Sequence, residues 1–343
     1  MDEQEEKAVR QILLVILTLG LTVCFSGCAT PMPQSWEMMH VDNSADELSS
    51  TVLCIRFVSR THGWALTPNY LLETLDSGKT WIKRIHGDKE RASLFEFLVF
   101  LDSIHMWIVG SQQCPSRLEG CGFVWGSADG GERWDRFEIS MISGLHGATF
   151  CSRDLGWAVG SSASTKQLDE PKIVRTLNGG RIWTEQNPPP NINCTLLGIT
   201  CFSGQEVLAV GTDGVILHTS DGGESWITRR SSVISTLFRV RFFGDHAWAL
   251  GAAGTLLRSD DRGVTWKRVV LATEESLTDI LMDGDRGWIV GENGTLLSSS
   301  NGGDSWNPEK SGTSSDLYSL SSWGSFVWVA GARLTVIRLA LSD

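Results

Sequence analysis

Short apolar runs bounded by Gly, Asp and Ser recur along the chain. One type centres on Trp and usually ends at Gly, and its seven copies lie at residues 63–66, 106–110, 156–160, 208–211, 247–251, 287–291 and 327–331, the fourth with Leu in place of Trp. Another apolar run precedes each copy, as at residues 98–101 and 279–282. Short runs of this kind between turn residues are typical of strands, so the pattern predicts an all-β chain.

An eight-residue pattern ending in Trp, called the box below, follows six of these seven copies. The boxes are residues 74–81, 127–134, 176–183, 219–226, 259–266 and 299–306, and the steps between their Trp residues are 53, 49, 43, 40 and 40. A period of 40 to 50 residues is the length of a four-stranded propeller blade.

The residues of the box have the chemistry of a turn. Asp or Asn at the third position can bond its own backbone two residues on, and Gly at the fifth position supplies a positive φ without steric cost. The final Trp is expected to pack its ring across the hairpin. We therefore assign a structural and not a catalytic role to the third and eighth residues, which are Asp76, Trp81, Asp129, Trp134, Asn178, Trp183, Asp221, Trp226, Asp261, Trp266, Asn301 and Trp306.

These repeats predict a seven-bladed β-propeller of four-stranded antiparallel blades. Each blade is expected to contain an inner strand, the Trp-containing strand, a third strand such as residues 214–218, and an outer strand after the box. The seventh blade, from Leu317 to about Leu341, lacks a box and an outer strand. Residues 35–41 begin with Ser-Trp, as a box ends, so we expect them to supply the missing strand and close the ring. The propeller is thus predicted to span residues 35–343.

The first 28 residues have the features of an export signal. Residues 12–25 form an apolar run, Lys7 and Arg10 precede it, and no Lys or Arg follows until Arg56. Fourteen residues suit the apolar region of a signal peptide better than a membrane-spanning helix.

Residues 25–28, Phe-Ser-Gly-Cys, resemble a bacterial lipobox. This predicts that Cys28 is the lipidated first residue of the mature protein, followed by a tether at residues 29–34. Its acyl chains would hold the protein stably at a membrane, so we expect an exported lipoprotein, periplasmic or at the cell surface. Cleavage after Ala29, which gives a soluble exported protein, and an uncleaved anchor are the alternatives.

Six cysteines follow the lipobox: Cys54, Cys114, Cys121, Cys151, Cys194 and Cys201. An even number in an exported chain permits disulfides. Cys114 and Cys121 bracket one short loop and are the preferred pair. Cys151 is a weaker candidate to pair with Cys194 or Cys201, and buried free thiols are the alternative. None has metal-ligand spacing with His, so neither a zinc site nor another cofactor is predicted.

Composition narrows the choice of partners. The chain has 36 Gly and 15 Trp, which fits many tight turns that are each followed by a large apolar anchor. Its formal net charge is −11. Because an acidic chain repels nucleic acid and anionic lipid, we expect neither as a partner.

The boxes resemble the Asp-box (BNR) repeat of sialidases and many other propellers. The full blade, as in residues 285–306, more closely resembles the photosystem II stability and assembly factor family of cyanobacteria and plastids and its bacterial relatives, over roughly residues 35–341. The resemblance implies a lumenal or periplasmic seven-bladed propeller, often a lipoprotein, that binds an assembly intermediate through an Arg patch and catalyses nothing.

Candidate partner-binding residues lie away from the boxes. Two loops on the opposite face are long, residues 111–120 and 161–171, and they contain Arg117 and Lys166; binding residues concentrate in such insertions. Arg239 and Arg241, on one inner strand, are the nearest candidates for an Arg patch. Two arginines there need carboxylate partners or must line the central channel, and Glu96 is one acidic candidate.

We therefore expect a monomeric, membrane-anchored binding or assembly module whose partner is a membrane protein complex or its assembly intermediate. A sialidase-like glycoside hydrolase is an alternative, but it would need an Arg triad and a Tyr nucleophile with a Glu partner. Only Tyr70 and Tyr318 exist, and neither lies in a matching motif. A structural subunit of a larger surface complex is the other alternative.

Overall fold

Strands form where the short apolar runs predict them. The computed structural model describes residues 36–39, 51–114, 120–162 and 170–341. The predicted export signal with Cys28, the tether, Arg117 and Lys166 lie outside these residues. Within the described part of the chain, no helix has the length and apolar composition needed to cross a membrane.

Four-stranded antiparallel sheets make up the first four blades. Blade one contains β2 (Cys54–Phe57), β3 (Gly63–Leu66), β4 (Tyr70–Thr74) and β5 (Ile82–His86). Blade two contains β6 (Leu94–Phe100), β7 (Met106–Gln112), β8 (Cys121–Ser127) and β9 (Asp135–Ile139). Blade three contains β10 (Ile142–Phe150), β11 (Gly156–Ser162), β12 (Lys172–Thr176) and β13 (Trp183–Gln186). Blade four contains β14 (Leu196–Cys201), β15 (Val207–Gly211), β16 (Ile216–Thr219) and β17 (Ile227–Arg229).

The last three blades repeat this order. Blade five contains β18 (Leu237–Phe243), β19 (His246–Gly251), β20 (Thr255–Ser259) and β21 (Lys267–Val269). Blade six contains β22 (Leu277–Asp283), β23 (Arg286–Gly291), β24 (Leu296–Ser299) and β25 (Asn307–Pro308). Blade seven contains β26 (Leu317–Trp323), β27 (Phe326–Gly331), β28 (Val336–Ala340) and β1 (Glu37–Met39). The single 3-10 turns η1 (Thr212–Gly214) and η2 (Glu292–Gly294) connect strands in blades four and six.

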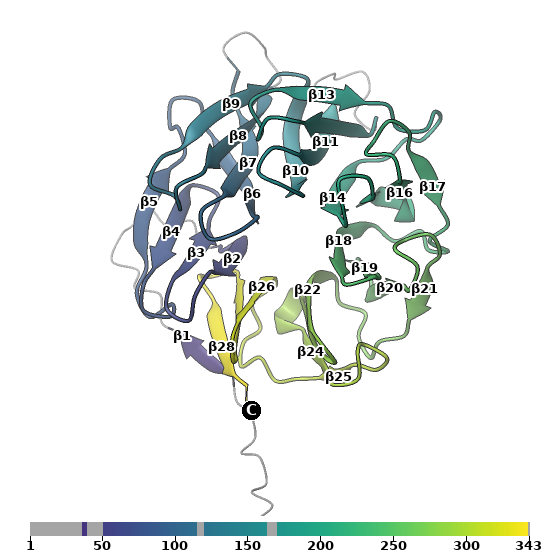
Figure 1. Cartoon of the computed structure of the whole chain (residues 1–343). Coiled ribbons are helices and arrows are strands. Elements are labelled where there is room, and N and C mark those ends of the chain that lie inside the picture. Colours follow the sequence, from purple (N-terminus) through teal and green to yellow (C-terminus); the bar gives the residue numbers. More distant parts are fainter. Residues whose placement is uncertain (1–35, 40–50, 115–119, 163–169, 342–343) are drawn as a thin grey trace, which may run out of the picture. The chain divides into compact units, whose positions relative to one another are not determined.

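The seven sheets follow one another around a central channel (Figure 1). Inner strands of successive blades contact each other, and β26 contacts β2, so the ring is closed. Seven apolar clusters form the core, and each joins the facing surfaces of two neighbouring blades. The predicted fold class, a seven-bladed propeller of four-stranded blades, is confirmed.

The second strand of a blade is buried on both faces because a neighbouring sheet packs on each side. All five residues of β15 are buried, which explains its unbroken apolar sequence. Its final glycine has a further reason: a Cβ on Gly211 would lie 2.1 Å from the carbonyl oxygen of Thr195. The inner strand therefore approaches too closely for any larger residue at this position.

Each box closes the turn between the third and fourth strands. In box four, the Thr219 hydroxyl donates to Asp221 Oδ1 at 2.7 Å and accepts from the Gly223 N–H at 2.9 Å, while Asp221 Oδ1 accepts from the Ser225 N–H at 3.0 Å. The side chain thus bonds the backbone four residues on, rather than two as expected. The fifth-position glycines have φ between 83° and 96°, as Gly223 illustrates at 96°.

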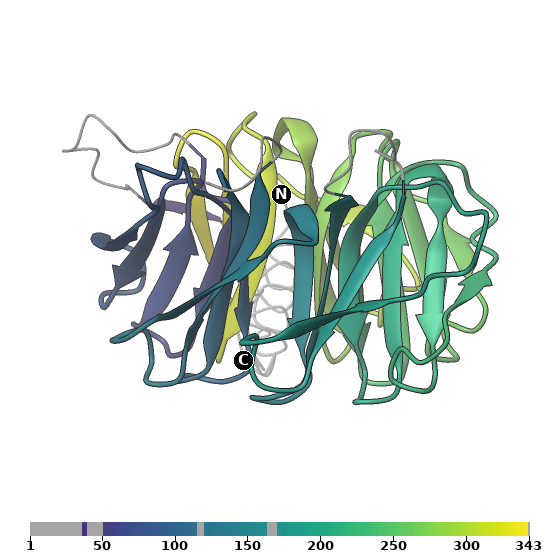
Figure 2. The same cartoon turned by 90° about the horizontal axis from the view of Figure 1, so that it is seen from above.

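Residues 37–39 close the ring as predicted. β1 pairs antiparallel with β28, with Met38 opposite Ile337. Met39 is buried against Trp328 and Val336 in the cluster between blades seven and one. Strands run between two opposite faces (Figure 2), and because every fourth strand begins at a box, β1 also begins on the face that carries the boxes.

Candidate functional site

A cavity of about 170 Å³ lies in the central channel and is lined by residues of six inner strands. Three arginines line it, Arg56 on β2 and Arg239 and Arg241 on β18. Arg56 and Arg241 occupy the same position of the repeat, since each lies opposite the Trp of its own second strand. The channel of an acidic protein is therefore lined by a cluster of cations.

One carboxylate balances part of this charge. Asp279, on β22 of the adjacent blade, is fully buried. Arg241 donates Nε to Asp279 Oδ1 at 2.8 Å and Nη2 to Oδ2 at 3.1 Å. The backbone N–H groups of Ile280 and Leu320 also donate to Asp279, at 3.0 and 2.9 Å. Asp279 thus ties together the inner strands of blades five, six and seven.

The other two arginines are less well neutralised. Arg239 donates Nε to the Thr278 carbonyl at 3.3 Å, lies over the ring of Phe97 and stays 3.9 Å from Asp279. Among the described residues, Arg56 has no carboxylate within 4 Å. Its side chain is exposed in the channel. Three guanidinium groups around one carboxylate leave an excess of positive charge.

The pKa shifts of these arginines follow from their surroundings. Solvent reaches the Arg56 side chain, but the protein atoms that surround it in the channel, and then the positive charge of Arg241, lower its pKa. Burial also lowers the pKa of Arg239, although Asp279 opposes that effect. Burial acts in the same direction on Arg241, but the ion pair with Asp279 outweighs it and raises the pKa. Guanidinium groups keep their protons under all these conditions, so the cluster stays cationic and suits an anionic ligand.

Glu96 is not the partner of Arg239 or Arg241. Its Oε1 accepts a hydrogen bond from the Ser111 hydroxyl at 2.8 Å, and its Oε2 lies 3.4 Å from Nδ1 of His146. Both contacts lie on blades two and three, whereas the arginines lie on blade five. The carboxylate that the arginines need comes from the neighbouring blade six.

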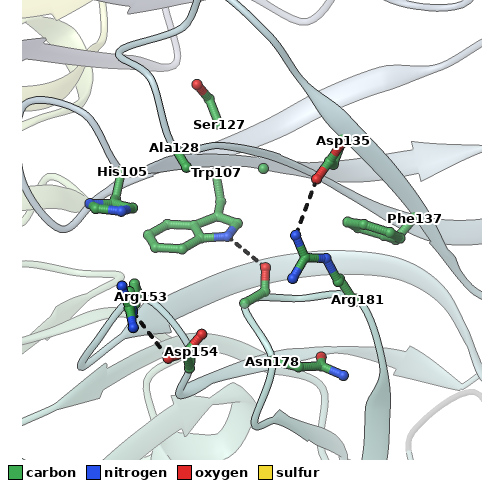
Figure 3. Close-up of a pocket in the computed structure, with 12 residues that line it drawn as sticks. His105, Trp107, Ser127, Ala128, Asp135, Phe137, Arg153, Asp154, Asn178 and Arg181 are labelled. Atoms are coloured by element: carbon green, nitrogen blue, oxygen red, sulfur yellow. Dashed lines mark hydrogen bonds and ion pairs between the residues drawn. The ribbon is translucent and has the colours of Figure 1, made fainter.

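A second depression, of about 300 Å³, lies between blades two and three on the face that carries the boxes (Figure 3). Trp107 and Phe137 form part of its wall, and the indole N–H of Trp107 donates to the Gly179 carbonyl at 2.9 Å. Arg153 and Arg181 also line it and pair with exposed carboxylates. Its lining residues lie on second, third and fourth strands, turns and boxes, whereas the channel arginines lie on the inner strands β2 and β18.

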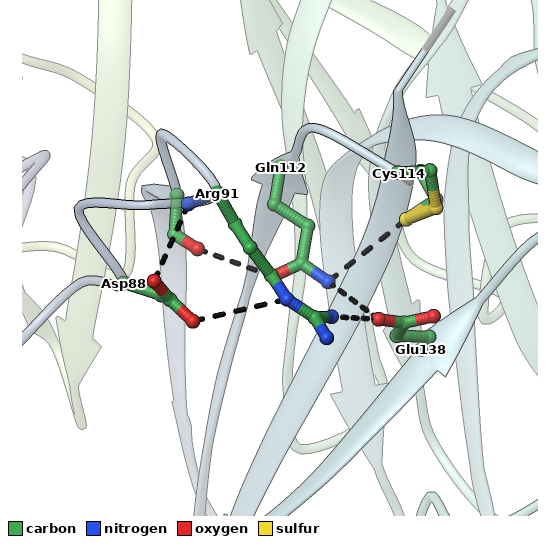
Figure 4. Close-up of a disulfide and its surroundings, with 7 residues drawn as sticks. Asp88, Arg91, Gln112, Cys114 and Glu138 are labelled. Carbon is green, nitrogen blue, oxygen red and sulfur yellow. Dashed lines mark hydrogen bonds and ion pairs between the residues drawn. A yellow bond between two sulfur atoms is a disulfide. The ribbon is translucent and has the colours of Figure 1, made fainter. Parts of the chain in front are cut away.

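Two disulfides join cysteines of blades two to four. Cys114 is bonded to Cys121 in the loop between β7 and β8, and Figure 4 shows Gln112 and Glu138 beside it. Cys151 is bonded to Cys201, which joins the inner strands of blades three and four. The other two cysteines of the propeller, Cys54 and Cys194, are buried, and Cys54 is a free thiol.

Polar contacts fix the base of this loop. Gln112 donates Nε2 to Glu138 Oε1 at 3.2 Å, and Arg91 also bonds Glu138. Within the described residues, one group of three potential metal ligands occurs, Cys114, Cys121 and Glu138. Its two sulfur atoms are already bonded to each other, so the group is not a metal site in this state.

Neither tyrosine is placed as a sialidase nucleophile would be. Tyr70 is buried, with its ring against His86 and Lys83. Tyr318 donates its hydroxyl to Asp316 at 3.3 Å, and burial together with the Asp316 carboxylate raises the pKa of that hydroxyl. A raised pKa makes the phenolate harder to form.

Sequence reasoning missed Arg56 and Asp279. The signal for Arg56 was present, because aligning the blades on the Trp of the second strand places it at the position of Arg241. Asp279 aligns in the same way with Arg239, one blade later. Arg117 and Lys166 lie outside the described residues, so their relation to the cluster stays a prediction.

Comparison with known proteins gives a family match over most of the chain. The profile of the family described as photosynthesis system II assembly factor YCF48 matches residues 29–141, 127–232 and 228–312. The photosystem II assembly lipoprotein Ycf48 of Synechococcus sp. (strain CC9902) is 24% identical over 178 residues, which are 51% of this chain and 47% of that protein. The chain thus matches about half the length of this curated relative.

Solved structures share the fold at low sequence identity. The structure of YCF48 bound to D1 peptide has a TM-score of 0.67 and 19% identity, over 90% of this chain and 97% of that one. The Niastella koreensis GH74 enzyme has a TM-score of 0.65 and 13% identity, over 84% of this chain and 52% of that one. At such identities both likenesses establish the propeller fold alone.

Proposed function

Because the chain belongs to the photosynthesis system II assembly factor YCF48 family, we propose that it is a non-enzymatic binding protein that assists the assembly of a membrane protein complex. Its ligand is an anionic segment of a subunit of that complex, bound at the arginine cluster of the channel. The protein acts as an exported monomer held at the membrane through Cys28. A relative bound to a D1 peptide supports a peptide as the ligand.

The single observation that carries this proposal is the excess positive charge of the channel. Arg56 is exposed and has no carboxylate partner among the described residues, and Arg239 has free guanidinium N–H groups beside it. A carboxylate or a side-chain acid of a peptide would supply the missing anion with charge-assisted hydrogen bonds. The side chains of Arg239 and Arg241 are only 20% and 33% exposed, and partial burial strengthens such bonds relative to those at an open surface.

Arg56→Gln tests the proposal, because this side chain has no ion pair whose loss would destabilise the fold. The full-length protein and its variants are expressed in the native host, cross-linked in membranes and purified with their partners. Arg268→Gln is the matched control, since Arg268 is exposed on the outer strand β21. We expect the wild type and Arg268→Gln to retain the same membrane-protein subunit, and Arg56→Gln to lose it at least about tenfold.

A peptide from the recovered subunit, with acidic residues or a free carboxyl terminus, then measures binding directly. Equal recovery by Arg56→Gln and the wild type would show that the partner does not bind at the channel. Hydrolysis of a glycan panel by the wild-type protein would instead favour the glycoside hydrolase alternative. Release of Cys28→Ser from membranes tests the lipid anchor separately.

A further inference from the structure

The face that carries the boxes, called the box face below, also carries the turns between the first and second strands. In blades one to four and six, a backbone hydrogen bond joins this turn to the box of its own blade. The Gly130 N–H donates to the Ile104 carbonyl at 3.0 Å, and the Gly179 N–H donates to the Asp154 carbonyl at 2.9 Å. The same bond joins Gly302 to Asp285 in blade six, at 2.8 Å. The boxes and these turns therefore form one continuous surface.

Large apolar side chains are exposed on one part of the box face. Leu75 and Leu177 occupy the second position of boxes one and three, where blades four to six have Ser220, Asp260 and Ser300. Their exposed fractions are 56% and 65%. Ile104, in the turn of blade two, and Trp323, the last residue of β26 in blade seven, are exposed as well.

Ile182, at the seventh position of box three, is 69% exposed. In boxes one, four and five this position holds a Thr or Ser whose hydroxyl donates to the Asp at the third position. Isoleucine cannot make that bond, so the turn does not explain why it is there. Leu75, Ile104, Leu177, Ile182 and Trp323 are called the apolar arc below, and they extend from blade seven through blades one, two and three.

The charges of the box face also differ between the blades of the apolar arc and blades four to six. Arg60, Lys79 and Arg133, in blades one and two, are exposed, and within the described ranges no carboxylate lies within 4 Å of them. Arg153 and Arg181 pair only with exposed Asp side chains, at 3.3 and 3.5 Å, and such exposed pairs are weak. Blades four to six instead present mainly acidic residues here, which are Glu206, Glu224, Asp245, Asp260, Asp285 and Asp304.

The depression between blades two and three lies within the apolar arc. Arg153 and Arg181 line it together with Trp107 and Phe137 (Figure 3). Guanidinium groups bind phosphate oxygens, and aromatic side chains suit the boundary between water and hydrocarbon. Apolar side chains at loop tips beside basic residues are the combination that binds an anionic lipid surface.

The entry of the chain into the propeller favours the same occupant. β1 is the outer strand of blade seven, so Trp36 lies on the box face, in the blade that also carries Trp323. Trp36 is only eight positions after Cys28, and eight residue steps can span at most about 28 Å. If Cys28 is lipidated, as predicted, the box face is held within that distance of the bilayer.

We propose that the box face of blades seven, one, two and three rests on an anionic phospholipid bilayer, with the apolar arc inserted among the headgroups and the neighbouring arginines on lipid phosphates. The net charge of −11 argued against anionic lipid, but the acidic residues of the box face lie mainly on blades four to six.

Hydrogen exchange of the full-length lipoprotein tests this orientation in vesicles without any other protein. The protein is reconstituted in phosphatidylcholine with phosphatidylglycerol, in phosphatidylcholine alone, and in detergent. In the anionic vesicles we expect several-fold slower exchange in boxes one and three and in the turns at Ile104 and Trp323 than in detergent. Boxes four to six should exchange at equal rates in both media.

The double variant Leu177→Ser and Ile182→Ser gives box three the serines that box four carries at both positions. It should fold normally and lose most of the protection. Val264→Ser removes an exposed apolar residue from box five and should change nothing. Weaker protection in phosphatidylcholine alone is expected, because the arginines then lack an anionic partner.

Several outcomes would overturn the proposal. Equal exchange in vesicles and detergent, or equal protection of all six boxes, would show that this face does not meet the bilayer. Protection that survives the double serine variant would remove the apolar arc from the contact. Equal protection in the two kinds of vesicle would remove the anionic lipid. Protection found only in native membranes would assign the face to a protein partner.

Discussion

At the scale of single residues, Asp279 decides how the channel tolerates its arginines. A buried carboxylate without partners would cost several kcal/mol. Here Asp279 accepts two hydrogen bonds from Arg241 and two more from backbone N–H groups. Its removal would leave all four donors without this acceptor, and the guanidinium of Arg241 without its counter-charge.

We therefore expect Asp279→Ala to lower the free energy of unfolding by about 3–5 kcal/mol. Asp283→Ala is the control, because Asp283 ends the same strand, is exposed and pairs only with the exposed Arg286. That change should stay within about 0.5 kcal/mol. Urea unfolding of the three proteins measures both values. Similar stabilities of the two variants would show that the buried pair contributes no more than a surface one.

The sequence predicted only part of the arrangement of charged residues in the channel. The spacing of Arg239 and Arg241 on one strand correctly predicted a need for a carboxylate. The candidate Glu96 was wrong, because it lies on blade two and bonds Ser111. The inner strand of blade six lies beside β18, and its Asp279 supplies the carboxylate that both arginines approach. Alignment of the blades supplies that neighbour relation, whereas charge and burial alone do not.

At the scale of elements, the boxes link the fold to pH. Hydrogen bonds from Ser225 and Thr219 lower the pKa of Asp221 from 3.8 to about 2. Partial burial acts to raise the pKa of Asp261, but bonds from Thr265 and Ser259 outweigh it and bring the value to about 2. A carboxyl whose pKa is lower in the folded state stabilises the fold above its unfolded pKa and loses that contribution as the pH falls through the folded value.

The double variant Asp221→Asn and Asp261→Asn should reveal this contribution. Boxes three and six already use Asn178 and Asn301 at the same position, so the turns should persist. Because these carboxyls are largely exposed, we expect a loss on the order of 1 kcal/mol or less per box near neutral pH. Between about pH 4 and pH 2 the wild type should lose stability more steeply than the variant. Urea titrations across this range measure both slopes, and parallel slopes would contradict the assignment.

The elements themselves were largely predictable, and the boxes show why. Turn residues, apolar runs and a period near 40 residues each indicate the same strand order, and all three act locally along the chain. The hydrogen-bond partner of the third-position side chain was not predictable. The expected bond to the residue two positions on requires the same residue types as the observed bond to the residue four positions on. In the structure the first-position hydroxyl, as in Thr219, holds the fifth-position N–H and leaves the carboxylate for the seventh position.

At the scale of the whole molecule, closure joins two segments that are about 300 residues apart. Glu37 lies opposite Arg338 and bonds it at 2.6 Å. A propeller that lacked this strand would expose the edge of β28 and one side of the apolar cluster that contains Met39. Closure was predictable because blade seven lacked a box and residues 35–36 ended like one, a mismatch that only a full count of the repeats reveals.

Two adjacent methionines allow the contribution of side-chain packing in β1 to be measured. Met39 is buried between blades seven and one, whereas Met38 points away and is 52% exposed. We expect Met39→Ala to lower the free energy of unfolding by about 2–3 kcal/mol, through lost burial and the cavity that remains. Met38→Ala should change it by no more than about 0.5 kcal/mol. If urea unfolding gave equal values for both, the N-terminal strand would not be part of the cooperative core, and the ring would owe its stability to the contact between β2 and β26 alone.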